Sequence, residues 1–93
     1  MAYRVVIGDS AGREIRKLPK DVQRRVVAKA EALANDPRPP GCKKLEGIEN
    51  LYRVRTGDYR IVYRIDDEIL LVLIVTIGNR ADVYERLRRM RRR

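Results

Sequence analysis

Residues 51–65 read LYRVRTGDYRIVYRI, and this stretch decides the fold of the chain. In residues 59–65 the tyrosines and isoleucines fall on one side, while two arginines and a valine fall on the other, as in a β-strand with one face on a core. Residues 51–56 alternate in the same way, and the Gly-Asp pair at 57–58 favours a tight turn. The stretch therefore predicts an antiparallel hairpin with one hydrophobic face and one basic face.

The segments on either side add two strands and two helices. Residues 69–77 are almost continuously aliphatic, which is typical of a central strand buried on both faces. Residues 3–7 are short and β-branched and predict a first strand. Residues 11–18 and 22–33 carry hydrophobic side chains at helical spacing, so we expect two amphipathic helices there.

Capping residues, a loop and a basic tail complete the pattern. We expect Asp9 or Ser10 to cap the first helix and Asp21 to cap the second. Residues 35–41 contain three prolines and a glycine, which predict an irregular loop. Residues 82–93 have the composition of a helix. Its hydrophobic stripe would consist of Val83, Leu87 and Met90.

These elements predict a single α+β domain over residues 1–93, in the order β-α-α-β-β-β followed by a C-terminal helix. The two-helix hairpin is expected to pack on one face of an antiparallel sheet. The other face of the sheet is then left for function.

The composition excludes several classes of protein. No uncharged hydrophobic run reaches about 18 residues, as a membrane-spanning helix requires, and the N-terminal hydrophobic run is too short for a signal peptide. We therefore expect a cytoplasmic protein with no membrane partner. The single cysteine, Cys42, excludes a disulfide framework, and the absence of histidine removes the usual triads and most metal sites. We expect neither a metal ion nor a small-molecule cofactor.

Positive charge points to a polyanionic partner. The chain has 22 basic and 13 acidic residues, a net charge of +9, and 17 of the basic residues are arginine. Arginine binds phosphate with two parallel hydrogen bonds and stacks on bases, so nucleic acid is favoured. A proteome that prefers arginine throughout would explain the same ratio.

The alternation in the hairpin concentrates this charge on one face. Arg53 and Arg55 point away from the hydrophobic side, and Arg60 joins them if the strand register allows. Arg80, just past the last strand, would close the patch. Mutually repelling guanidinium groups on one surface are explained by a polyanionic ligand. The alternative is that they form the solvated outer face of an antiparallel sheet.

Five short motifs resemble the RelE branch of the RelE/ParE toxin superfamily, whose members are toxins of bacterial and archaeal toxin–antitoxin operons. They are KL-x-G at 44–47, LYRVR at 51–55, GDYRIVY at 57–63, IG-x-R at 77–80 and VY at 83–84. The resemblance covers nearly the whole chain. The GDYRIVY segment is typical of the superfamily as a whole, and the G-x-R…VY ending favours RelE.

The resemblance implies a RelE-like fold and a ribosome-dependent mRNA endonuclease. Such an enzyme enters the A site of the 70S ribosome and cuts the codon there, with the RNA 2′-hydroxyl as nucleophile and a 2′,3′-cyclic phosphate as product. It also implies a cognate acidic antitoxin that binds the toxin. The implied catalytic residues are Arg55, Arg60, Arg80 and Tyr84. The RNA-binding residues are expected to be Lys43, Lys44, Arg53 and Arg55.

Two positions depart from the family pattern. Well-known members carry lysines where this chain has Arg53 and Arg55, and arginine is a poor proton acceptor. Position 79, often basic in relatives, is Asn79. We therefore expect one of two consequences: weaker activity, or a larger share of the general-base role for Tyr84 with arginines as its neighbours. Two alternatives stay open: a ParE-like gyrase inhibitor on the same fold, and a nonenzymatic RNA-binding module.

Overall fold

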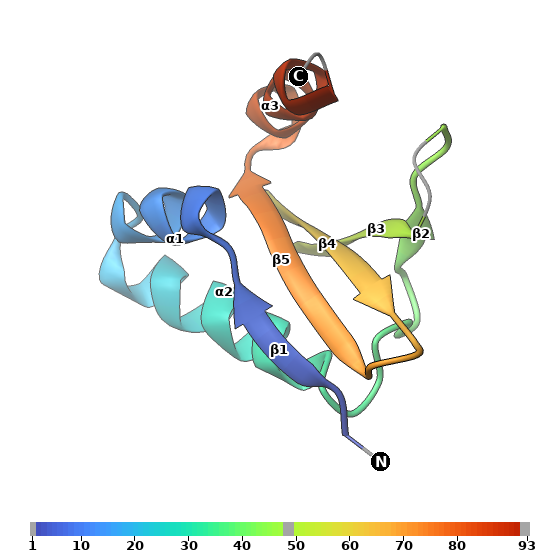
Figure 1. The fold of residues 1–93 in the computed structure, drawn as a ribbon. Helices are drawn as coiled ribbons and strands as arrows, with labels where there is room; N and C mark the ends of the chain where they lie inside the picture. The colour runs from blue at the N-terminus through green and yellow to red at the C-terminus, as the bar shows by residue number, and fades with distance from the viewer. Residues whose placement is uncertain (1, 48–49, 92–93) are drawn as a thin grey trace.

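Within residues 2–47 and 50–91, which the computed structural model describes, the chain forms three helices and a five-stranded sheet (Figure 1). The sheet order is β1-β5-β4-β3-β2. This is the α+β arrangement that the sequence predicts. Along the chain the elements are β1 (Arg4–Ile7), α1 (Asp9–Arg16), α2 (Lys20–Ala32), β2 (Lys43–Lys44), β3 (Leu51–Thr56), β4 (Tyr59–Asp66), β5 (Leu71–Gly78) and α3 (Arg80–Arg91).

The sheet is mixed rather than fully antiparallel, which corrects one expectation. Strands β2 to β5 pair antiparallel, but β1 runs parallel to β5, with Arg4 opposite Leu71 and Ile7 opposite Ile74. Alternation along a strand tells which face is buried and carries no information on the direction of its neighbour. The short strand β2 was also not predicted, because two consecutive lysines have no strand pattern.

Helices α1 and α2 cover one face of the sheet, and the main core lies between them and the strands (Figure 1). Most residues of their predicted hydrophobic stripes are buried, while Leu18 and Val27 are half-buried against the core. The β3–β4 hairpin contributes Val54, Ile61 and Tyr63, from the side of the strands that the alternation assigned to the core. The other buried members are Ala11, Ile15, Val22, Val26, Ala30, Leu33, Ile65, Val72, Ile74 and Ile77.

The helix starts differ from the prediction. Helix α1 begins directly after Gly8 and α2 directly after Pro19, and neither of these N-cap residues makes a side-chain capping hydrogen bond. The predicted caps Asp9, Ser10 and Asp21 are therefore wrong. Asp9 and Asp21 instead lie in the first turns, where a carboxylate is stabilised by the helix dipole.

Strand β5 starts later and is less buried than its aliphatic sequence predicts. Leu70 adopts a left-handed conformation with φ of 53°, so the turn after β4 extends through it and leaves Ile69 exposed. On one face β5 contributes to the main core. On the other face Leu71, Leu73 and Val75 are only half-buried.

Helix α3 lies against part of the face that was expected to be open. Val83 and Leu87 of α3 pack on Leu51 and Val62 in a second hydrophobic cluster. Met90, the third residue of the predicted stripe, is 36% exposed. The sheet face opposite α1 and α2 is thus divided between a part under α3 and a part that α3 leaves uncovered.

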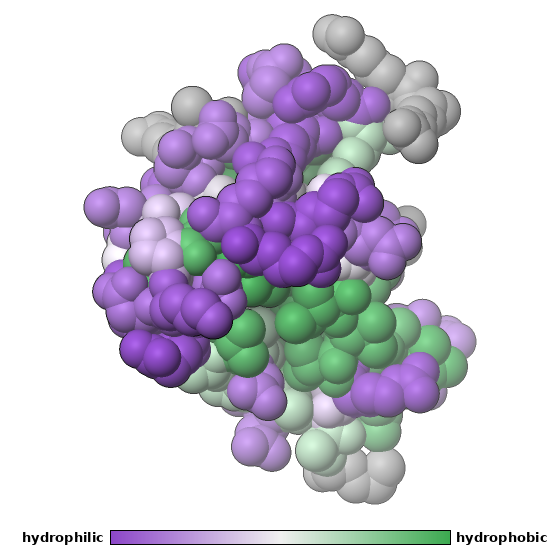
Figure 2. All heavy atoms as spheres, turned by 90° about the vertical axis from the view of Figure 1, so that its left-hand side faces the viewer, coloured by the Kyte–Doolittle hydropathy of each residue, from purple (hydrophilic) through white to green (hydrophobic). Residues whose placement is uncertain are grey.

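The surface seen from the side of α1 and α2 is divided by polarity. Figure 2 shows hydrophilic side chains gathered at the height of α1 and α3, above an area of hydrophobic side chains. Val6 and Ile7 of the edge strand β1 are among the exposed hydrophobic residues. Hydrophilic side chains therefore gather, on this side of the molecule, at the height of α1 and α3.

Candidate nucleic-acid interface

The register of the hairpin brings four basic residues to one face of the sheet. Arg55 lies directly opposite Arg60, and Arg53 lies opposite Val62 on one side and Lys43 on the other. Directly opposed residues of an antiparallel pair project from the same face. The expectation that Arg60 shares a face with the two arginines of β3 is confirmed. We call Lys43, Arg53, Arg55 and Arg60 the basic face.

No described carboxylate forms an ion pair with any residue of the basic face; the described ion pairs lie elsewhere. The Nε atom of Arg60 is buried, with no hydrogen-bond partner among the described residues. An unsatisfied buried donor and a like charge directly opposite both reduce stability. An arrangement that is unfavourable by itself and made of forked donors can bind the phosphates of a polyanion.

The two neighbouring lysines of β2 project from opposite faces of the sheet. Lys43 pairs with Arg53 and shares its face, whereas Lys44 pairs with Tyr52, whose ring packs against the main core. Of the two lysines expected to bind RNA, the structure therefore brings only Lys43 to the basic face. Lys44 projects from the opposite face, because consecutive strand residues alternate.

Helix α3 starts at the end of β5, beside the row formed by Arg55 and Arg60. Arg80 is its first residue, and the Arg80 side chain lies outside the described part of the structure. The Oδ1 atom of Asn79 accepts a hydrogen bond from the Asp82 backbone N–H at 3.1 Å, so Asn79 caps the helix. Tyr84 is half-buried against the second hydrophobic cluster.

Arg86 is a residue near the site that the sequence reasoning missed. Its guanidinium donates to the carbonyl of Ile77 and forms an ion pair with Glu14 of α1 at 3.0 Å. It lies over Gly78, where an added Cβ would come within 2.7 Å of Arg86 Nη1. Gly78 is directly opposite Arg60. The glycine that ends β5 was the available signal, because it leaves room for another side chain to cross.

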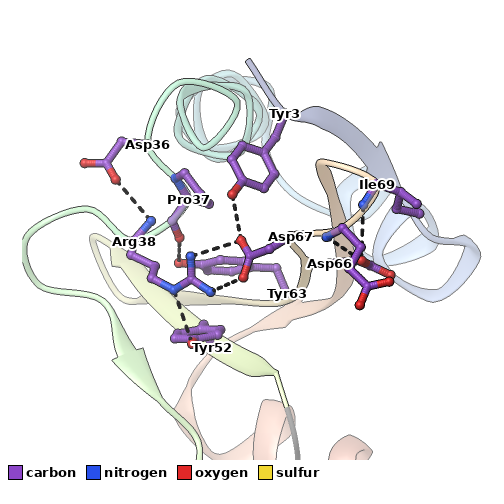
Figure 3. Close-up of polar contacts among 10 residues, drawn as sticks. Tyr3, Asp36, Pro37, Arg38, Tyr52, Tyr63, Asp66, Asp67 and Ile69 are labelled. Carbon is purple, nitrogen blue, oxygen red and sulfur yellow. Dashed lines mark hydrogen bonds and ion pairs between the residues drawn. The ribbon is translucent and has the colours of Figure 1, made fainter. Parts of the chain in front are cut away.

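A polar cluster far along the sheet has a structural role (Figure 3). Arg38 of the proline-rich loop binds both carboxylate oxygens of Asp67, lies over the Tyr52 ring and hydrogen-bonds its hydroxyl. Tyr3 donates to Asp67 at 2.6 Å. The hydrogen bonds from Arg38 and then Tyr3 lower the pKa of Asp67. These contacts connect the loop to β3 and to the turn after β4, and through Asp67 to the residue that precedes β1.

The loop is also held from inside the core. The hydroxyl of the fully buried Tyr63 donates to the carbonyl of Pro37 at 2.7 Å, and burial raises the pKa of Tyr63. Asp66 accepts hydrogen bonds from the backbone of Glu68 and Ile69. The acidic residues 66–68 therefore serve the turn and the loop. In the described part of the chain, no three carboxylate or thiol groups are arranged to hold a metal ion.

None of the helices in the described ranges is long and hydrophobic enough to cross a lipid bilayer.

Residues 5–84 match the family of ParE toxins of type II toxin–antitoxin systems. The chain belongs to the RelE/ParE toxin superfamily. Toxin RelG of Mycobacterium tuberculosis is 36% identical to it, over 92% of this chain and 100% of RelG. The mRNA interferase toxin RelE of Escherichia coli K12 is 32% identical, over 90% of this chain and 92% of that protein.

Solved structures of RelE/ParE toxins confirm the RelE-like fold. The toxin–antitoxin complex RelBE2 of Mycobacterium tuberculosis contains a chain that is 34% identical, with a TM-score of 0.75 over 86% of this chain and 100% of that one. The archaeal RelE–RelB complex of Pyrococcus horikoshii gives 33% identity and a TM-score of 0.76 over 86% and 97% of the two chains. The RelE branch, which the C-terminal motifs favour, is thus well represented among the relatives.

Proposed function

We propose that this protein is the toxin of a type II toxin–antitoxin pair and that it inhibits translation by cutting mRNA. Support comes from its similarity to a relative named mRNA interferase toxin, over 90% of the chain. The observation that carries the proposal in the structure is the basic face, where Arg55 and Arg60 lie directly opposite each other without a described acidic partner.

In the proposed reaction the RNA supplies its own nucleophile. The 2′-hydroxyl loses its proton and its oxygen attacks the adjacent phosphorus, while the bond from phosphorus to the 5′-oxygen breaks and that oxygen takes up a proton. The products are a 2′,3′-cyclic phosphate and a 5′-hydroxyl. Arg60 and Arg80 would stabilise the charge of the pentavalent phosphate. No metal ion is needed for these steps.

The remaining residues divide between binding and proton transfer. Lys43, Arg53 and Arg55 would bind the phosphates on either side of the cut. Arginine stays protonated, so we assign the general base to Tyr84 of α3, which packs on the second hydrophobic cluster. The chain offers charge but no strong base, and orientation of the RNA must come from elsewhere. We therefore propose that it acts in the A site of the ribosome.

The proposed partner in the resting cell is an acidic antitoxin. Several similar solved structures are complexes of a RelE toxin with a RelB antitoxin. An acidic segment would relieve the self-repulsion of the basic face and of a chain with a net charge of +9. We place the toxin and this complex in the cytoplasm, where translating ribosomes are found.

Primer extension on a translated message tests the activity. We expect cuts on translating ribosomes, little cutting of the same RNA without ribosomes, and loss of the cuts in Arg60→Ala. End-group analysis of the upstream fragment should find a 2′,3′-cyclic phosphate. Equal cutting of free RNA would reject the dependence on ribosomes, and absence of cutting in both cases would reject the endonuclease.

The matched family model favours one competing function. Because it describes ParE toxins, inhibition of DNA gyrase on the same fold is the second candidate. A gyrase supercoiling assay with the purified protein separates the two. Inhibition that survives in Arg60→Ala, together with an intact message on ribosomes, would establish the gyrase function instead.

A further inference from the structure

Helix α3 brings positive charge onto a positive face. Its twelve residues contain five arginines and two acids, a net charge of +3, and its N-terminal end lies beside Arg60. The described hydrophobic anchors are Val83 and Leu87, which are 0% and 7% exposed, while Met90 is 36% exposed. Two buried side chains and the half-buried Tyr84 must therefore outweigh electrostatic repulsion.

One of these charges, on Arg86, attaches α3 to the rest of the molecule. The fork of its guanidinium reaches back past the end of β5, where it donates to the Ile77 carbonyl, and on to Glu14 of α1 at 3.0 Å. Both side chains of the ion pair are only 20% exposed. Solvent and salt screen such a pair less than a fully exposed one. A single side chain thus connects α3, β5 and α1.

The ion pair spans a cleft between the two helices. This cleft has a volume of about 570 Å³, and the residues that line it include Glu14 and Arg86 together with Ser10, Arg13 and Met90. Because the cleft separates α1 from α3, the Glu14–Arg86 pair ties together two helices that are not packed closely along their length.

The crossing point of Arg86 relates α3 to the basic face. Arg86 lies above Gly78, which is directly opposite Arg60 in the sheet. Tyr84 lies two residues before Arg86 in α3 and packs on the second hydrophobic cluster. The Arg86 guanidinium therefore lies at the strand position that faces Arg60.

We infer that the Glu14–Arg86 ion pair positions α3, and with it Tyr84 and Arg80, beside Arg60 for the cleavage step. Both residues act through others, so they are positioning residues. The inference rests on the proposed function, because only there are Tyr84 and Arg80 assigned to the reaction. It adds two residues on distant segments of the chain to those that the motifs identify.

Removal of the Glu14 carboxylate distinguishes positioning of α3 from general electrostatic attraction to RNA, because the two explanations predict different effects on cleavage. Glu14→Ala makes the protein more positive, so attraction alone would strengthen RNA binding and leave cleavage intact. Positioning instead predicts a single-turnover rate at saturating ribosomes that falls on the order of 10- to 100-fold, with an unchanged or lower half-saturating concentration. Glu31→Ala, which removes an exposed carboxylate of α2, and Lys17→Ala, which removes the weaker second partner of Glu14, are the controls.

Hydrogen exchange reads the position of α3 without reference to activity. In Glu14→Ala and in Arg86→Gln we expect faster exchange of the α3 amides from residue 84 onward, with β4 and β5 unchanged. The double variant should be no slower in cleavage than either single one, because both substitutions break the same connection. The inference would be overturned if the losses of cleavage rate in the two single variants multiplied in the double variant. It would also be overturned if the α3 amides exchanged at the wild-type rate in both single variants.

The outcomes also separate this inference from the proposed function. If the wild-type chain cuts no translated message, the proposed function fails and the positioning role fails with it. If the wild-type chain cuts normally and Glu14→Ala behaves like Glu31→Ala, the proposed function stands and the inference alone is overturned.

Discussion

Arg60 combines two features that reduce stability with a central place on the basic face. Its Nε atom is buried without a described partner, and Arg55 lies directly opposite with the same charge. Both features oppose folding. A residue that disfavours the folded state and lies on a concentrated basic surface is expected to trade stability for function.

We predict that Arg60→Met slows cleavage on the order of 100-fold, because a donor to the transition-state phosphate is lost. The same variant should be more stable by about 0.5 to 1 kcal/mol, since the like-charge contact with Arg55 disappears and the side-chain stem remains. Single-turnover cleavage on ribosomes and urea unfolding measure the two effects.

Arg64→Met is the matched control, because Arg64 is an exposed arginine of the same strand. It should change neither quantity much. An equal loss of cleavage in the two variants would mean that general attraction to RNA, rather than a specific contact by Arg60, governs the rate.

Tyr63 shows how a core tyrosine holds a loop. Its hydroxyl is the donor to the Pro37 carbonyl from a fully buried position. In Tyr63→Phe that carbonyl loses its partner, so we expect a loss of about 1 to 2 kcal/mol in the free energy of unfolding. Urea denaturation measures it. Tyr59→Phe is the control, because the half-buried Tyr59 has no hydroxyl partner among the described residues, and an equal loss there would contradict the assignment.

At the scale of elements, the proline-rich loop is a fastened segment rather than a free connection. Arg38 reaches from it to Asp67 in the turn after β4 and to Tyr52 in β3. The prolines of residues 35–41 exclude regular structure, as predicted. The sequence does not reveal that the loop closes the far end of the core, because its contacts come from residues 14 to 29 positions away.

The Arg38–Asp67 contact predicts an acid-sensitive part of the stability. The pKa of Asp67 in the folded protein is lowered from its ordinary value of 3.8, mainly by the hydrogen bond from Arg38. The stabilisation is therefore present above pH 3.8 and is lost as the pH falls below that value through the folded pKa. The difference in urea midpoint between wild type and Asp67→Asn should shrink from pH 7 to pH 3. Asp58→Asn, in an exposed turn, should show no such change, and a constant difference for Asp67→Asn would refute the role.

At the scale of the whole molecule, the concentration of positive charge on one face should be measurable in the salt dependence of RNA binding. Four basic residues share the basic face, and binding of single-stranded RNA releases about 0.7 counterion per phosphate contact. We expect the logarithm of the binding constant to fall with the logarithm of salt concentration with a slope of about −3.

The neighbouring lysines of β2 provide the control for this slope. Lys43→Ala should reduce the steepness by about 0.7, whereas Lys44→Ala should leave it nearly unchanged, because Lys44 pairs with Tyr52 on the opposite face. Fluorescence anisotropy with a short RNA at several salt concentrations measures both. Equal effects of the two lysines would show that RNA contacts are not confined to the basic face.

The sequence by itself determined most of the elements, with the strand β2 as the exception, and which face of the β3–β4 hairpin is hydrophobic. Hydrophobic spacing located both helices of the hairpin and placed Tyr63 in the core and Arg53 and Arg55 on the opposite side. These features depend on side chains close in the chain, where the periods of helix and strand decide which residues share a face. The family motifs added Arg60, Arg80 and Tyr84 as the implied catalytic residues, which remains a prediction.

Only the tertiary structure decided how distant segments meet. The parallel pairing of β1 with β5, the direct opposition of Arg55 and Arg60, the separation of Lys43 from Lys44 and the contact of Glu14 with Arg86 all depend on register or on packing between elements. Periodicity reports the environment of a residue but not the identity of its partner. Glu14 and Arg86 are 72 positions apart, and each by itself is an ordinary polar residue of an amphipathic helix. Their role follows from the fold, which brings both helices to the same end of β5.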